Sequence, residues 1–126
     1  MAEREEGIVR AFLDASVKGD IDQVLSYFAD GGSYRMSRWH EPFVGRAAIR
    51  GDFERQRALW SDFRYELVNV ASTGNIVFAE RIDTVRMMGK DLVSHMVGVF
   101  EVDADARITS WRDYFDMKEV EAQLVS

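Results

Sequence analysis

The hydrophobic periodicity of this sequence changes once, near Asp62, and that change limits the folds open to the chain. Before Asp62 the apolar residues recur about every 3.6 positions, which is the pattern of helices that bury one face. Asp20 stands where a helix N-cap is expected, and Gly31-Gly32 ends the apolar run that follows it. The first half therefore predicts helices at residues 3–18, 21–28 and about 46–60, with a short extended segment at residues 33–39.

Beyond Asp62, apolar and polar residues alternate, as they do in strands that bury one face. Turn-forming residues such as Gly74-Asn75 and Gly89-Lys90 separate the alternating runs. The predicted strands are residues 63–71, 76–87, 92–102 and 108–115, and residues 118–124 predict a terminal turn of helix. Helices followed by an antiparallel meander predict an α+β fold, with the helices on one side of a curved sheet.

Composition and charge exclude several classes of protein. A chain of 126 residues, with 47% hydrophobic and 30% charged residues, predicts one soluble globular domain over residues 1–126. The absence of cysteine excludes disulfides, thiol nucleophiles and cysteine-ligated zinc. The 16 basic and 22 acidic residues give a net charge of -6, which disfavours nucleic acid and anionic membranes as partners. Because no signal peptide or long apolar run is visible, the expected location is cytoplasmic.

Three charged residues interrupt the apolar faces of two predicted strands. Arg81 and Asp83 share one face of the strand at residues 76–87 with apolar side chains. Asp113 lies between Trp111 and Phe115 on one face of the last strand. If both apolar faces line the same interior, the two acids and the guanidinium converge there, because a planar guanidinium can bind two carboxylates at once.

Such a cluster has a structural and a functional interpretation. A buried ion pair that only fixes packing is costly, because both charges lose their hydration. Alternatively, one arginine compensates two neighbouring acids incompletely, so that their titrations couple and one acid keeps its proton near neutral pH. A protonated acid beside an ionised one is a general acid/base pair. Tyr34, on the short extended segment, could donate to a substrate, hold a water or be an aromatic residue at the pocket rim.

The two histidines do not indicate a metal site. His40 and His95 share no metal-ligand spacing with each other or with an acidic cluster. Satisfied or solvent-facing imidazoles are therefore expected at both positions. The sequence predicts neither a metal ion nor a cofactor.

Several motifs together resemble limonene-1,2-epoxide hydrolase. They are Arg81-Ile82-Asp83, Gly98-Val99-Phe100 and Trp111-Arg112-Asp113-Tyr114-Phe115-Asp116, with Val44-Gly45-Arg46 before the third predicted helix. The resemblance covers nearly the whole chain. It implies the SnoaL-like, nuclear-transport-factor-2-like fold, in which a cone-shaped curved sheet carries N-terminal helices on its concave face. That scaffold also hosts isomerases, cyclases and noncatalytic domains, so the fold by itself does not define an activity.

The resemblance also implies roles for individual residues. Asp113 resembles the base that activates water, Asp83 the acid that protonates the epoxide oxygen, and Arg81 the bridge between them. Tyr34 resembles one of the residues that hold the water. The family has Tyr-x-Asn at this place, whereas this chain reads Tyr34-Arg35-Met36, and a thioether cannot position water as an amide does.

The function implied is a cofactor-independent epoxide hydrolase that adds water in one step to a small apolar epoxide and forms a vicinal diol. The residues expected to form the apolar pocket are Met36, Val85, Met96, Trp111 and Phe115. Two alternatives remain open. One is an isomerase or cyclase in which Asp113 removes a proton from carbon, which requires no held water. The other is a noncatalytic ligand-binding domain in which the ionic cluster is structural.

Apolar residues are also expected on the outer face of the sheet. They are Tyr65, Leu67, Ile82 and Tyr114. An apolar outer face would be covered by a second copy of the chain, because large exposed apolar patches are uncommon in monomers. The sequence therefore predicts a homodimer.

Overall fold

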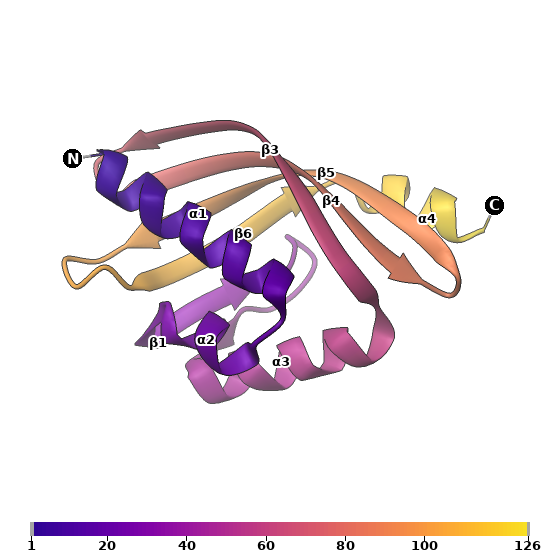
Figure 1. The fold of residues 1–126 in the computed structure, drawn as a ribbon, viewed down its shortest axis with the longest axis horizontal. Coiled ribbons are helices and arrows are strands. Elements are labelled where there is room, and N and C mark those ends of the chain that lie inside the picture. Colours follow the sequence, from indigo (N-terminus) through magenta and orange to yellow (C-terminus); the bar gives the residue numbers. More distant parts are fainter. Residues whose placement is uncertain (1, 126) are drawn as a thin grey trace.

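The strands predicted for the second half of the chain form an antiparallel meander, and two further strands extend it (Figure 1). The structure, a computed structural model, describes residues 2–125. The strands are β1 (Phe28–Arg35), β2 (Phe43–Val44), β3 (Ser61–Thr73), β4 (Ile76–Met87), β5 (Lys90–Val102) and β6 (Ile108–Phe115). The helices are α1 (Ala2–Lys18), α2 (Ile21–Ser26), α3 (Arg46–Leu59) and α4 (Met117–Leu124). The six-stranded sheet has the order β2-β1-β6-β5-β4-β3 and is curved, and the N-terminal helices cover its concave face.

The prediction was wrong around Phe28 and at the end of the extended segment. The second helix ends at Ser26, and Phe28 instead begins β1, which pairs in parallel with β6. Gly31-Gly32 lies at an irregularity in that pairing, and a Cβ atom on Gly32 would stand 2.9 Å from the carbonyl oxygen of Ile108. Gly32 therefore permits a close approach of two strands, and the pair Gly31-Gly32 does not end a helix. β1 ends at Arg35, before the predicted limit of the extended segment.

The core lies between α1 and the concave face of the sheet. Phe12 of α1 makes edge-on aromatic contacts with Phe28, Phe100 and Trp111, at centroid distances of 5.5, 5.9 and 5.0 Å. The side chains of Phe12, Phe28 and Phe100 are fully buried. Burying one such side chain contributes about 1.5–3 kcal/mol. This aromatic cluster holds β1, β5 and β6 in a fixed relation under α1.

The C-terminal helix α4 covers part of the edge of β5. β6 ends opposite Met96, so the preceding part of β5 has no strand on that side. The Gln123 side-chain amide accepts from the backbone N–H of Val93 (2.8 Å) and donates to its carbonyl (2.7 Å). Glu119 accepts from the backbone N–H of His95 at 2.9 Å. Two side chains of α4 thus bind backbone groups that a neighbouring strand would otherwise bind.

The residues predicted for the outer face divide between the two faces. Tyr65 is paired with Asp83 and Leu67 with Arg81, and both apolar side chains pack against the core. The prediction that they lie on the outer face was wrong. Residues directly opposite each other on neighbouring strands point to the same side, so Tyr65 and Leu67 lie on the inner face with Asp83 and Arg81. Ile82 lies on the other face, as does Tyr114, which is 43% exposed. The homodimer stays a prediction.

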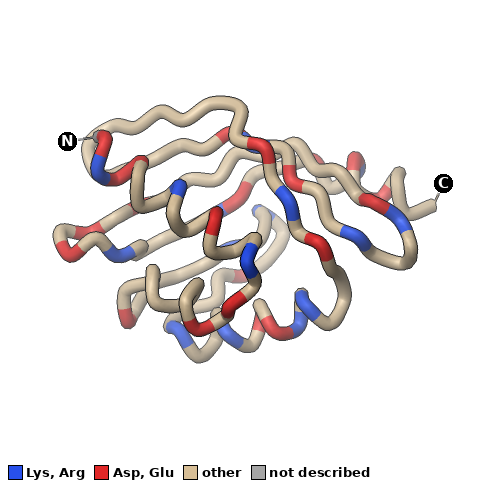
Figure 2. Tube along the Cα trace, in the orientation of Figure 1, with Lys and Arg blue, Asp and Glu red and all other residues tan. Residues whose placement is uncertain are grey.

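Charged residues are spread along the chain. Figure 2 shows Lys and Arg interspersed with Asp and Glu on helices and strands. Partly exposed pairs include Arg46 with Asp30 (2.8 Å) and Arg112 with Glu101 (2.7 Å). Such pairs contribute about 0–1 kcal/mol each, because water and salt screen them. No helix within residues 2–125 is long and apolar enough to cross a membrane.

Candidate active site

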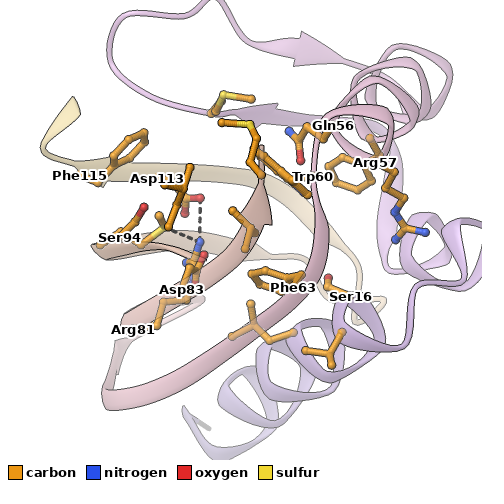
Figure 3. A pocket seen from close by; sticks show the side chains of 18 of the residues that line it. Ser16, Gln56, Arg57, Trp60, Phe63, Arg81, Asp83, Ser94, Asp113 and Phe115 are labelled. Carbon is orange, nitrogen blue, oxygen red and sulfur yellow. Dashed lines mark hydrogen bonds and ion pairs between the residues drawn. The ribbon is translucent and has the colours of Figure 1, made fainter. Parts of the chain in front are cut away.

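A pocket of about 490 Å³ lies between α3 and the inner face of the sheet (Figure 3). All nine residues that the sequence analysis assigned to the site line it. They are Tyr34, Met36, Arg81, Asp83, Val85, Met96, Trp111, Asp113 and Phe115. Side chains from β1, β4, β5 and β6 thus meet at one place, although they are widely separated in the sequence.

Arg81 bridges the two acids inside this pocket. Its Nε atom donates to Oδ1 of Asp83 at 2.9 Å, and its Nη2 atom donates to Oδ2 of Asp113 at 2.8 Å (Figure 3). The exposed fractions are 2% for Arg81, 9% for Asp83 and 6% for Asp113. The convergence that strand alternation predicted is therefore present, and all three charged side chains are buried.

Gly98 of β5 makes room for this bridge. β5 lies between β4 and β6, and Gly98 is directly opposite Asp113. A Cβ atom on Gly98 would lie 2.5 Å from Nη1 of Arg81 and 3.0 Å from Oδ1 of Asp113. Any side chain at this position would collide with the guanidinium. Glycine is thus required for Arg81 to reach across β5 to the acid on β6.

Trp111 orients Asp113. Its indole Nε1 donates to Oδ1 of Asp113 at 2.8 Å, so each carboxylate oxygen of that acid accepts a hydrogen bond. The indole is itself held by stacking on Phe100, with ring centroids 5.4 Å apart. From the sequence, Trp111 was predicted only as part of the apolar wall. The available signal was its spacing of two residues from Asp113, which puts both side chains on one face of a strand.

The remaining contacts of Arg81 are weaker. Its Nη2 atom is 2.9 Å from the sulfur of Met96. The guanidinium carbon lies 5.7 Å from the centroid of the Trp111 ring, at cation–π distance. Among the described residues no hydrogen-bond partner reaches its buried Nη1 atom. The position of the guanidinium therefore depends mainly on its two carboxylates.

Burial alters the proton affinity of this cluster. Loss of water around Asp83 raises the pKa of its carboxyl above the ordinary value, and repulsion from Asp113 adds to the effect, although Arg81 opposes it. Burial alone would lower the pKa of Arg81, but the two acids reverse this and raise it. Arg81 thus stays charged, while Asp83 keeps its proton to a higher pH than a free aspartic acid does.

Tyr34 lies beside this cluster and is also buried. Its ring is 4.4 Å from the Trp111 ring, centroid to centroid, and its hydroxyl oxygen accepts from Nε2 of Gln56 at 3.3 Å. Burial and the nearby charge of Asp113 raise the pKa of Tyr34, so it remains a hydroxyl donor. Gln56 comes from α3 and was not predicted as a site residue. The signal for it was a polar residue on the helix face that buries Ile49 and Phe53.

The rest of the pocket wall is mainly apolar. Met117 and Val120 of α4 add to the predicted residues Met36, Val85 and Phe115. The helix thus closes one side of the pocket close to the end of β6. A pocket with apolar walls and a few converging polar groups suits a small, weakly polar ligand.

His40 lines the same pocket as the acids, but each histidine is hydrogen-bonded to another residue. Nδ1 of His40 is 2.6 Å from Oγ of Ser37, and Nδ1 of His95 is 2.6 Å from Oε2 of Glu119. Within the part of the chain that the structure describes, no three His, Cys, Asp or Glu residues are grouped so that they could hold a metal ion. In this pocket Asp83 and Asp113 share the guanidinium of Arg81 as their ionic partner.

Comparison with known proteins agrees with this architecture. Residues 9–111 match the SnoaL-like domain family. Epoxide hydrolase EphG of Mycobacterium tuberculosis is 32% identical over 117 residues, which span 89% of this chain and 73% of that protein. A solved LEH-like epoxide hydrolase of M. tuberculosis is 29% identical, with a TM-score of 0.83 over 98% of this chain and 94% of that one. The epoxide hydrolase/cyclase-like enzyme SalBIII shares the fold at 18% identity, with a TM-score of 0.84 and coverage of 93% and 94%. The chain therefore belongs to the SnoaL-like domain family.

Proposed function

We propose that this protein is a cofactor-independent epoxide hydrolase that adds water to a small apolar epoxide and releases a vicinal diol. The observation that carries the proposal is the buried pair of acids joined by Arg81 at an apolar pocket. Identity of 32% to a protein named as an epoxide hydrolase supports the same reaction class. The pocket volume of about 490 Å³ falls within the usual range for small-molecule sites.

In the proposed reaction, water attacks one carbon of the epoxide ring. Asp113 takes a proton from that water while the water oxygen forms the new bond to carbon. The bond between this carbon and the ring oxygen breaks, and Asp83 gives its proton to that oxygen. Arg81 contacts both acids, so its charge offsets whichever of them is ionised before and after the step. Proton exchange with solvent then returns both acids to their starting states.

Isotopically labelled water tests this single-step addition. Enzyme in excess is mixed with cyclohexene oxide or styrene oxide in labelled water, and the diol from the first turnover is analysed by mass spectrometry. We expect one labelled oxygen in that diol, because the attacking oxygen comes from water. Unlabelled diol in the first turnover would instead indicate attack by an enzyme carboxylate. No turnover of either epoxide, with Asp83 and Asp113 intact, would count against epoxide hydrolysis.

The raised pKa of Asp83 predicts the pH dependence of the reaction. Asp83 must carry its proton in the free enzyme, so kcat/KM falls as pH rises through the Asp83 pKa. Because burial raises that pKa, the active form persists to higher pH than an ordinary Asp would allow. The same shift makes the free energy of unfolding fall as pH rises from the ordinary pKa of aspartic acid to the raised pKa of Asp83. In this interval the folded state binds more protons than the unfolded state. Rates and thermal melting should be measured in the same buffers; a rate that keeps rising with pH in the folded protein would contradict the role of Asp83.

The pocket also supports a second candidate reaction. Met36 lines the pocket where a water-holding amide would favour hydrolysis, and a thioether is no donor. An isomerase or cyclase that uses Asp113 to remove a proton from carbon needs no such amide. Exchange of the α-hydrogens of cyclohexanone in deuterated water, lost in Asp113→Asn, would favour this candidate over the hydrolase.

A further inference from the structure

We propose that Asp52 and Gln56 of α3 form a relay that fixes the direction in which Tyr34 donates its hydroxyl hydrogen. Both are positioning residues, since they act through Tyr34. The inference rests on the proposed function, in which Tyr34 holds the water that Asp113 activates. It assigns a positioning role to two residues of α3, whereas the other proposed catalytic residues lie on strands.

Asp52 determines which end of the Gln56 amide faces it. Asp52 is 2% exposed, and one of its carboxylate oxygens is paired with Arg55. Its other oxygen, Oδ2, is 2.7 Å from Nε2 of Gln56. Because the ion pair with Arg55 holds Asp52 as a carboxylate, Oδ2 has no hydrogen and can only accept, so the amide must present its NH₂ group here. The spacing of four residues puts the two side chains on the same face of α3.

The same nitrogen reaches Tyr34. Nε2 of Gln56 is 3.3 Å from the Tyr34 hydroxyl oxygen, and an amide NH₂ group has two hydrogens, one for each partner. The Tyr34 oxygen is therefore an acceptor toward Gln56, and its own hydrogen has to point elsewhere. Figure 3 shows Gln56 on the α3 side of the pocket, across from the strands that carry Arg81 and Asp113.

The direction of that hydrogen matters for the proposed reaction. Water in front of Asp113 gives one proton to the carboxylate, and a donor to the water oxygen keeps its remaining lone pair aimed at the epoxide carbon. Tyr34 can be that donor, and the raised pKa of its hydroxyl keeps the hydrogen in place. If the Gln56 amide were reversed, its oxygen would accept the Tyr34 hydrogen and the donor would be lost. Asp52 prevents this reversal.

A double-mutant cycle with Tyr34→Phe tests the relay. Gln56→Met should lower kcat about 10-fold, the effect of one oriented hydrogen bond, with little change in KM. Asp52→Asn should have a smaller effect in the same direction, because an amide at residue 52 accepts either orientation of Gln56. In the Tyr34→Phe background neither change should lower kcat further, since no hydroxyl is left to orient. Gln23→Met, the same substitution on the exposed surface of α2, is the matched control and should leave kcat unchanged.

Two kinetic results would overturn the relay. One is an equal loss of kcat from Gln56→Met in the parent and in the Tyr34→Phe variant; the other is no loss in the parent. Neutron diffraction from deuterated crystals gives a second test that does not depend on turnover. It should locate the Gln56 deuterium atoms toward Asp52 and Tyr34, and the Tyr34 deuterium away from Gln56. A Tyr34 deuterium directed at Gln56 would refute the relay, whereas inactivity of the parent toward epoxides would refute only the proposed reaction.

Discussion

Asp113→Asn is expected to lower kcat for epoxide opening by about 10²-fold or more, because an amide cannot take the proton from water. Asparagine has nearly the same shape but only one acceptor oxygen. Asp113 now accepts from both Arg81 and Trp111, so one of these buried donors will lose its partner in the variant. A loss of about 1–3 kcal/mol in the free energy of unfolding should accompany the loss of rate.

Initial rates and thermal melting should be measured together on this variant. Asp116→Asn is a matched control three residues further along the chain. Asp116 caps the N-terminus of α4 through a hydrogen bond from the backbone N–H of Lys118, and asparagine is an equally good N-cap. That control should keep its rate and its melting temperature. If folded Asp113→Asn hydrolyses epoxides at nearly the parental rate, another group is the base.

Arg81→Ala is expected to reduce stability as well as activity. Removal of one partner from a buried ion pair destabilises by about 3–5 kcal/mol, because it leaves a buried charge uncompensated. Here two carboxylates lose their shared partner. Arg81 now opposes the rise in the pKa of Asp83 that burial causes, so without it this acid should bind a proton more readily in the folded state and the destabilisation should shrink as pH is lowered. Urea denaturation at several pH values measures this trend.

Arg112→Ala provides the comparison for that experiment. Arg112 is also on an inner strand of the sheet, but its ion pair with Glu101 is partly exposed. Its removal should therefore change the free energy of unfolding by about 1 kcal/mol or less. An Arg81→Ala protein as stable as the parent at neutral pH would mean that the two acids do not depend on the guanidinium.

Local patterns predicted the antiparallel half of the fold well. The limits of β4 and β6 agree with the predicted residues 76–87 and 108–115, because alternation and flanking turns are both encoded within the strand. The segment near Phe28 was misassigned for a different reason. Its side chain fits the apolar face of a helix as well as that of a strand, and its strand partner begins at Ile108. Pairing over such a separation leaves no local signal.

The convergence of Arg81, Asp83 and Asp113 was determined by the sequence itself. Charged residues on the apolar faces of two strands must point to the interior whenever those faces are buried. Apolar residues that share those faces, such as Val85 and Phe115, line the same pocket as the three charged side chains. These inferences needed only the direction of each side chain relative to its own strand.

Only the tertiary structure decided how the acids are held. Gly98 allows Arg81 to cross β5, and this depends on the register of three strands. The contact of Gln56 with Tyr34 depends on how α3 lies over the pocket. Strand periodicity specifies the face on which a side chain lies, whereas a hydrogen bond also requires the relative position of two elements. That position is determined by packing among residues far apart in the chain, which no local pattern in one sequence records.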